Sequence, residues 1–296
     1  MTTDVIKLLF PIYLPVLLAG WFRRRGLYTR EVDSFLNTVA FYWLLPAVIL
    51  KGLVYNSVVI DSPLLLMVAF QAAVFILALV FFRLTGIEGN WLIMALRGNI
   101  VYFGIPVLGM ACTESDFLRG TLFISLLSPV TIALAGLAGR PGSGRGFWRP
   151  ILCNPFLFTL AAGILIRKFG LQVEFIRPVI DRCTDSLFFI SLLIVGGNME
   201  SLKGYGAVAM AEALAMFFKL IVLPVMFLIF GRLVGFDAVD LRIGLVIFSA
   251  PAAVTNYTMI RELGLPDRLV IKNVMLTTGI YLAYLPLLLK LIGLIR

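Results

Sequence analysis

The sequence predicts an all-α polytopic membrane protein with ten transmembrane helices, and three observations lead to this fold class. Hydrophobic residues make up 61% of the 296 residues and charged residues only 14%, and the mean hydropathy is +1.02. The apolar residues gather in continuous runs of about 20, the length that crosses the hydrocarbon of a bilayer. These runs do not alternate with a period of two, which argues against a transmembrane β-barrel. A water-soluble fold of this size could not bury so much apolar surface.

Ten apolar runs can be marked between charged or Gly/Pro-rich breaks. In chain order they cover residues 5–22, 35–54, 63–84, 91–112, 117–138, 150–166, 178–199, 207–233, 241–260 and 269–294. The N-terminus lacks the basic region and cleavage site of a signal peptide, so we expect the first run to remain in the protein. Ten spans leave about ten residues for each connection, so no extramembrane domain is expected.

An internal repeat divides the ten spans into two halves of five. The first and sixth spans both end in an apolar run, basic residues and a glycine, and these glycines, Gly26 and Gly170, are 144 residues apart. The prolines inside the fourth and ninth spans, Pro106 and Pro251, are 145 residues apart. Because five is odd, the second half enters the membrane from the opposite side, which makes an inverted repeat. We expect the first repeat at 1–139, a basic connecting loop at 140–149 and the second repeat at 150–296.

Basic side chains give the protein a formal net charge of +9. Because Lys and Arg lie at the ends of the apolar runs, anchoring at the surface of the lipid bilayer explains them, and no nucleic-acid partner is expected. Alternation of the spans puts Arg23, Arg83 and Lys272 on one side of the membrane and Lys51 and Arg177 on the other. The totals, twelve against eleven, do not decide the orientation. The basic cluster after the first span favours a cytoplasmic first loop, so both termini are expected outside, in a multi-pass protein of the bacterial inner membrane.

Several kinds of chemistry are excluded by what the sequence lacks. It has no histidine, and its three cysteines include no CxxC pair, so no metal site and no bound cofactor are expected. No GxxxxGK[ST] loop is present, which argues against nucleotide-driven transport. An intramembrane enzyme would need convergent acids, bases or metal ligands, so we expect that the protein is not an enzyme.

The fourth and ninth spans carry the features of broken helices. The fourth span has glycine and proline beside Asn99, and the ninth has proline with Asn256 nearby. The backbone groups that such residues free are tolerated in mid-membrane only inside protein or at a wet cavity. Matched interruptions in two inverted halves point to a transporter's central site, although ordinary proline kinks are the alternative reading. The residues expected at the substrate site are Asn99, Gly104, Ile105, Pro106, Pro251, Thr255, Asn256 and, in the fifth span, Ser128. On a helix Arg97 would be turned about 200° from Asn99, so a structural or dipole role is expected for it.

Ion coupling has three candidate residues, Asp185, Lys219 and Thr277. The ionisable side chain of Lys219 lies near the middle of the eighth span, where such a group is a functional hypothesis by default. Its alternative readings are an ion pair with a carboxylate of another helix, or snorkelling to the membrane surface. Glu212 lies seven residues earlier on the same helix face, and Asn198 is expected to be a helix end. The coupling ion would be Na⁺ or H⁺.

The motifs of the broken spans resemble those of the auxin efflux carrier family, which includes the plant PIN carriers and bacterial carboxylate permeases. The resemblance rests on Asn99 to Pro106 with its Gly-Ile-Pro ending, and on Ala250-Pro251 followed by Arg-Glu-Leu-Gly-Leu-Pro-Asp at 261–267. It implies a fold like the bile-acid symporters, with spans 1, 2, 6 and 7 as scaffold and spans 3–5 and 8–10 as a mobile transport domain. It also implies a crossing at Pro106 and Pro251, a homodimer formed through the scaffold, and a substrate carboxylate near Asn99. Asn256 stands where the PIN carriers have proline.

The function expected from the sequence is secondary transport of small organic anions. Carboxylates, auxin-like acids among them, would move by elevator-type alternating access. The alternatives are an obligatory sodium- or proton-coupled carrier of another solute, and a sensor built on a transporter fold.

Overall fold

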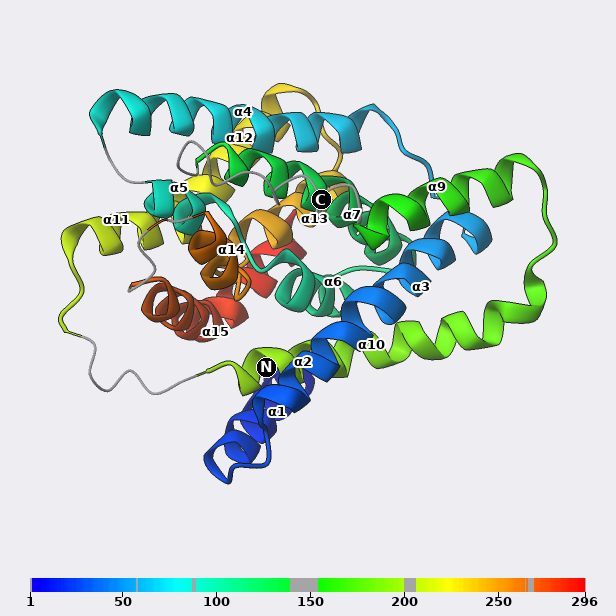
Figure 1. Ribbon diagram of the computed structural model, residues 1–296. Helices are drawn as coiled ribbons and strands as arrows, with labels where there is room; N and C mark the ends of the chain where they lie inside the picture. The colour runs from blue at the N-terminus through cyan, green and yellow to red at the C-terminus, as the bar shows by residue number, and fades with distance from the viewer. Residues whose placement is uncertain are drawn as a thin grey trace. The chain divides into compact units, whose positions relative to one another are not determined.

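The computed structural model describes residues 2–56, 58–86, 89–138, 154–199, 206–263, 265 and 269–295, coloured along the chain in Figure 1. Within these residues the secondary structure is helical, apart from an isolated antiparallel bridge between Gly98 and Ala252. The expected connecting loop at 140–149 lies outside the described residues.

Each of the ten apolar runs coincides with one helix or with successive helices. In the first half these are α1 (Thr2–Arg24), α2 (Arg30–Val39), η1 (Ala40–Leu44), α3 (Leu45–Leu50), η2 (Lys51–Tyr55), α4 (Ser62–Thr85), α5 (Gly89–Leu96), η3 (Ile100–Gly104), α6 (Ile105–Ala111) and α7 (Glu114–Gly136). In the second half they are α9 (Pro155–Lys168), α10 (Arg177–Gly197), α11 (Met210–Phe217), η6 (Phe218–Val222), α12 (Leu223–Leu233), α13 (Ala238–Ser249), α14 (Asn256–Glu262) and α15 (Val270–Leu294). The short 3₁₀ turn η5 (Glu174–Ile176) lies between the sixth and seventh runs.

Five helices of the described chain are long and apolar enough to cross a membrane. They are Arg30–Tyr55, Ser62–Thr85, Glu114–Gly136, Met210–Leu233 and Val270–Leu294. On the second of these, Leu77 and Leu84 are 70% and 83% exposed, an arrangement that lipid favours and water does not. The all-helical architecture is consistent with a helical membrane protein. That all ten runs span, as two inverted repeats, stays a prediction.

Three prolines follow wider turns rather than breaks, whereas Pro11, Pro15, Pro129 and Pro286 lie inside α-helices without such a turn. Pro46, Pro106 and Pro224 each follow a five-residue π-helical turn by two residues. Proline has no N–H and its ring clashes with the carbonyl four residues earlier, and a π-helical turn loosens the helix at that place. Pro106 is therefore the second residue of α6, and the fourth span is interrupted earlier, at residues 97–99. The prediction that the two broken spans cross at Pro106 is wrong, because the bridging residue is Gly98.

The two glycines that predict the repeat, Gly26 and Gly170, stand at similar helix ends. Gly26 and Gly170 adopt positive φ values of 74° and 60°, which glycine reaches without steric cost. At both positions the glycine N–H donates to the carbonyl three residues earlier, and the next N–H donates to the carbonyl five residues earlier. The same two hydrogen bonds also follow α12, at Gly235 and Phe236, so this is a common helix ending and the duplication stays a prediction.

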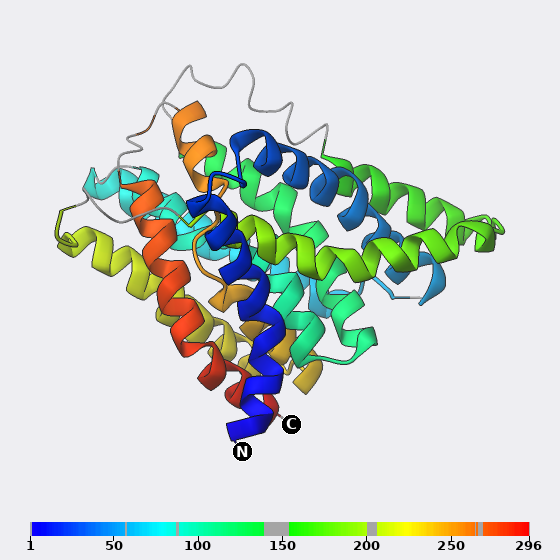
Figure 2. The same ribbon diagram turned by 90° about the horizontal axis from the view of Figure 1, so that it is seen from below.

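The chain packs into two compact units that interleave along the sequence. Unit 1 comprises Met1–Ile60, Val101–Ser125 and Pro155–Glu200, and unit 2 comprises Asp61–Ile100, Leu126–Asn154 and Ser201–Arg296. In unit 1, α1 packs across α10, as Figure 2 shows, and α3 packs on α9 and α10. In unit 2, α12 packs on α13, and α5 packs on α4, α11, α14 and α15. Unit 1 thus holds all of spans 1, 2 and 7 and the helix α9 of span 6, whereas spans 4 and 5 contribute to both units.

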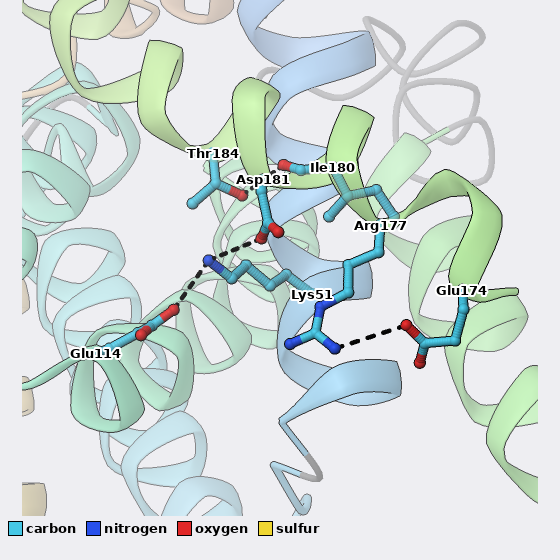
Figure 3. A network of polar contacts seen from close by, with 7 residues as sticks. All are labelled: Lys51, Glu114, Glu174, Arg177, Ile180, Asp181 and Thr184. Atoms are coloured by element: carbon cyan, nitrogen blue, oxygen red, sulfur yellow. Dashed lines mark hydrogen bonds and ion pairs between the residues drawn. The ribbon is translucent and has the colours of Figure 1, made fainter.

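Polar contacts within each unit join helix ends that the alternation of spans places on the same side. In unit 1 the Lys51 ammonium lies 2.9 Å from a Glu114 oxygen and 3.1 Å from an Asp181 oxygen (Figure 3). In unit 2 the Arg83 guanidinium donates to the Leu137 carbonyl at 2.9 Å. These contacts agree with the predicted up-and-down order of the spans inside each unit.

Candidate functional site

The candidate site is the place in unit 2 where two interrupted helices meet. The helix α5 ends at Leu96 and α13 ends at Ser249, and non-helical segments follow at 97–99 and 250–255. The two segments pair in antiparallel fashion at Gly98 and Ala252. The Asn99 N–H donates to the Pro251 carbonyl at 2.6 Å, and the Ala253 N–H donates to the Arg97 carbonyl at 3.1 Å. Each broken helix thereby satisfies backbone groups that the other one frees. We call residues 97–99 and 250–256 the crossing.

Close approach of a side chain explains the glycine at the centre of the crossing. A Cβ atom on Gly98 would lie 2.9 Å from both Cε and Nζ of Lys219 and 3.2 Å from the Ala250 carbonyl oxygen. Any larger residue would push against backbone and a buried ammonium group. The glycine therefore lets the segment pass between them.

Side-chain donors satisfy the carbonyls at the ends of α5 and α13. The Gln71 amide of α4 donates to the Leu96 carbonyl at 3.1 Å, and the Tyr284 hydroxyl of α15 donates to the Ser249 carbonyl at 3.1 Å. The Lys219 ammonium donates to the Phe248 carbonyl at 2.8 Å. Among these three donors only the ammonium carries a charge. The last carbonyls of a helix have no partner within it, so these contacts complete both helix ends.

Asn256, the first residue of α14, holds Arg97 through both ends of its amide. The amide oxygen accepts from Arg97 Nη1 at 3.1 Å, and the amide nitrogen donates to the Arg97 carbonyl at 3.0 Å. Asn256 is fully buried, whereas Arg97 keeps intermediate exposure. In the described part of the chain no carboxylate lies within ion-pair distance of Arg97. Figure 1 shows α14 beside α5.

The helical geometry expected for Arg97 and Asn99 is wrong, because both residues lie in the non-helical segment at 97–99. The expectation assumed that both residues belong to one helix, but α5 ends at Leu96. The sequence predicts a structural or dipole role for Arg97, and the structure places it in the crossing, where it is hydrogen-bonded to Asn256. The signal for the interruption was present in the triplet Arg97-Gly98-Asn99, whose glycine marks it.

The structure brings only some of the predicted substrate residues together. Asn99, Pro251, Thr255 and Asn256 belong to the crossing, and the side chain of Thr255 is exposed. Buried Gly104, Ile105 and Pro106 belong to unit 1 and contribute nothing to the pairing of the two segments in unit 2. Ser128 is buried in α7, and no described hydrogen bond joins its side chain to the crossing.

Of the three residues predicted to couple an ion, two lie at the crossing and one does not. Lys219 is 1% exposed at the crossing, and the Thr277 hydroxyl accepts from the Ala252 N–H there at 3.2 Å. Asp185 is exposed on α10 of unit 1. Both alternative readings of Lys219, an ion pair or snorkelling, are wrong because the ammonium bonds a buried backbone carbonyl.

Glu212 and Asn198 have structural partners. The Glu212 carboxylate pairs with Lys272 of α15 at 2.8 Å instead of approaching Lys219. Asn198 is the C-cap of α10, and its amide donates to Asp33 at 2.6 Å and to the Ile194 carbonyl at 2.8 Å. The expected helix-end role of Asn198 is confirmed.

Comparisons with known proteins leave the site to be interpreted from its geometry. Within the described residues no group of three or more Cys, Asp or Glu side chains could hold a metal ion. A scan against models of known protein families finds no match to this chain, and a search of curated proteins finds none either.

Proposed function

We propose that the protein is a secondary transporter of small organic anions, which bind at the crossing through Arg97. The observation that carries this proposal is an arginine among the interrupted segments whose described partners are an amide oxygen and no carboxylate. Guanidinium groups bind carboxylates through two parallel hydrogen bonds, so a carboxylate is the substrate group that Arg97 fits best.

The electrostatics of the crossing favour an anion over a metal cation. Arg97 belongs to it, and no described carboxylate pairs with the guanidinium group. Unpaired charges are costly to hold away from water, and a bound anion would offset that cost. Asn256 already fixes the Arg97 side chain, so less freedom would be lost on binding.

The rest of the proposal follows the resemblance to the auxin efflux carriers. The chain would have ten spans in two inverted repeats, at 1–139 and 150–296, with both termini outside the bacterial inner membrane. Spans 1, 2, 6 and 7 would form a dimeric scaffold, and spans 3–5 and 8–10 would move against it by elevator-type alternating access. No cofactor is proposed. The two compact units support this division for spans 1, 2 and 7 on one side and spans 3 and 8–10 on the other, whereas spans 4 and 5 contribute to both units.

Uptake of labelled mono- and dicarboxylates into proteoliposomes tests the proposal. Arg97→Gln is expected to lower uptake at least about tenfold, because a hydrogen-bonded charge pair contributes roughly 1.5–3 kcal/mol. Arg83→Gln is the matched control, since Arg83 is also an arginine of unit 2 that donates to a backbone carbonyl but lies at the exposed end of α4. Uptake by this variant should equal that of the wild type.

Three outcomes would replace the proposal. Equal uptake by Arg97→Gln and wild type would show that the substrate does not bind at Arg97. Uptake that stops when sodium is replaced by potassium, or when the pH gradient is collapsed, would favour an obligatory sodium- or proton-coupled carrier. Carboxylate binding without any uptake would favour a sensor.

A further inference from the structure

The position of Lys219 is unusual for a lysine in an apolar helix. It belongs to the π-helical turn η6, and 1% of its surface is exposed. Its ammonium group donates to the Phe248 carbonyl at 2.8 Å and passes directly beside Gly98. The eighth span thus delivers a positive charge between the two interrupted helices.

Both neighbours of the ammonium group are helix C-termini. Phe248 is the second-last residue of α13, and Gly98 lies two residues after the end of α5. The C-terminus of a helix carries roughly −0.5 elementary charge, so two of them together present about −1. One ammonium group supplies the charge that balances this.

Transporters with broken helices use the same feature to hold a coupling cation. Unwound carbonyls and the C-terminal ends of half-helices coordinate sodium or protons, while half-helix N-termini face the anionic substrate. At the crossing the charged donor to these carbonyls is a side chain of the protein itself. Glu212, seven residues before Lys219, is already paired with Lys272 and offers no carboxylate to an ion there.

We infer that Lys219 is a built-in counter-cation, which occupies the place where a cation-coupled carrier would bind its ion. The protein therefore needs no sodium to hold the two helix ends together. One consequence rests on the proposed function: carboxylate transport should proceed equally in sodium and in potassium.

The thermal stability of the full-length protein purified in detergent tests the inference without any substrate. The melting temperature is measured in chlorides of sodium, potassium, methylammonium and N-methylglucamine at equal concentration. The wild type should melt at the same temperature in all four salts. Lys219→Ala should melt at least about 4 °C lower in N-methylglucamine and regain half or more of that loss with methylammonium or sodium, which fit the vacated space.

Two further variants separate charge from packing. Lys219→Met should lose stability without rescue by any salt, because its side chain fills the space and carries no charge. Arg83→Ala removes a cation that also donates to a backbone carbonyl, at an exposed helix end, and should show neither loss nor rescue. Should Lys219→Ala fail to purify in N-methylglucamine, a monodisperse peak obtained only with methylammonium or sodium would support the inference.

A melting temperature of the wild type that rises specifically in sodium would overturn the inference, as would Lys219→Met with wild-type stability. Loss of stability in Lys219→Ala that none of the small cations restores would show that the lysine only fills space. Because no substrate is added, failure here is independent of failure of the transport assay.

Discussion

Replacing Lys272 by Met is expected to destabilise unit 2 strongly, because it leaves a buried carboxylate unpaired. The Lys272 ammonium lies 2.8 Å from Glu212 Oε2 and donates to the Ala207 carbonyl at 3.0 Å. The side chains of Lys272 and Glu212 are 5% and 0% exposed. Removing one partner of such a pair costs roughly 3–5 kcal/mol. At about 2 °C per kcal/mol, the melting temperature should fall by roughly 6–10 °C.

The double variant Glu212→Gln/Lys272→Met provides the control for this prediction. It removes both charges, so it should recover a large part of the loss, because replacing a whole buried pair by neutral groups is often nearly neutral. Glu212 Oε1 has no hydrogen-bond partner in the described structure, which makes the pair easier to replace. Melting curves of the four proteins give the coupling between the two residues. A fall of less than about 2 °C for Lys272→Met alone would refute the reasoning.

Three smaller perturbations follow from the packing. Gly98→Ala should lower the melting temperature, since its Cβ would lie 2.9 Å from the Lys219 ammonium, and the loss should shrink when Lys219→Ala is also present; equal losses in both backgrounds would contradict the close approach. Gly197→Ala should destabilise unit 1 because its Cβ would overlap the Tyr28 ring, whereas Gly206→Ala, with open space around it, should not; melting curves compare the two. Burial, followed by a hydrogen bond to a neighbouring carboxylate, raises the pKa of Tyr28, which lies in the turn between α1 and α2, far above its usual value of 10.0. The stability that the Tyr28 proton contributes is complete below pH 10 and is lost as the pH rises further. An ultraviolet titration should give the same tyrosinate absorbance at pH 11 for the wild type and for Tyr28→Phe, and a higher absorbance in the wild type would contradict the prediction.

Periodicity and length were sufficient to place the helices. The ten apolar runs match helices because a long continuous apolar stretch bounded by charges has few other solutions in lipid. Gly26 and Gly170, which predict the repeat, both stand at helix ends, as a glycine after an apolar run and basic residues indicates.

The register of the crossing could not be read from proline positions. Proline in the middle of a span predicts a break, but a preceding π-helical turn keeps Pro106 inside a helix. The residues next to Pro106 do not show whether the helix breaks or widens there. Gly98 is the better indicator of the interruption, since the close approach of Lys219 and of the Ala250 carbonyl leaves no room for a side chain there.

Partners that are distant in sequence were the least predictable part of the site. Asn256 and Arg97 are separated by 159 residues, and Lys219 and Phe248 by 29. Their pairing depends on how the helices pack, which a single sequence does not reveal. Gln71 and Tyr284 donate to the carbonyls at the ends of α5 and α13. In the sequence they are simply polar residues within apolar runs, and nothing indicates these partners.

The most direct test of the central claim, that an organic anion binds at Arg97, is a shift in melting temperature with a panel of mono- and dicarboxylates. A ligand that binds only the folded protein adds about 2.7 kcal/mol of stability at a hundredfold excess over its Kd, or roughly 5 °C here. We expect such a shift with at least one carboxylate, of equal size in sodium and potassium, for the wild type and for Arg83→Gln but not for Arg97→Gln. No shift with any carboxylate, or an equal shift in Arg97→Gln, would contradict the account.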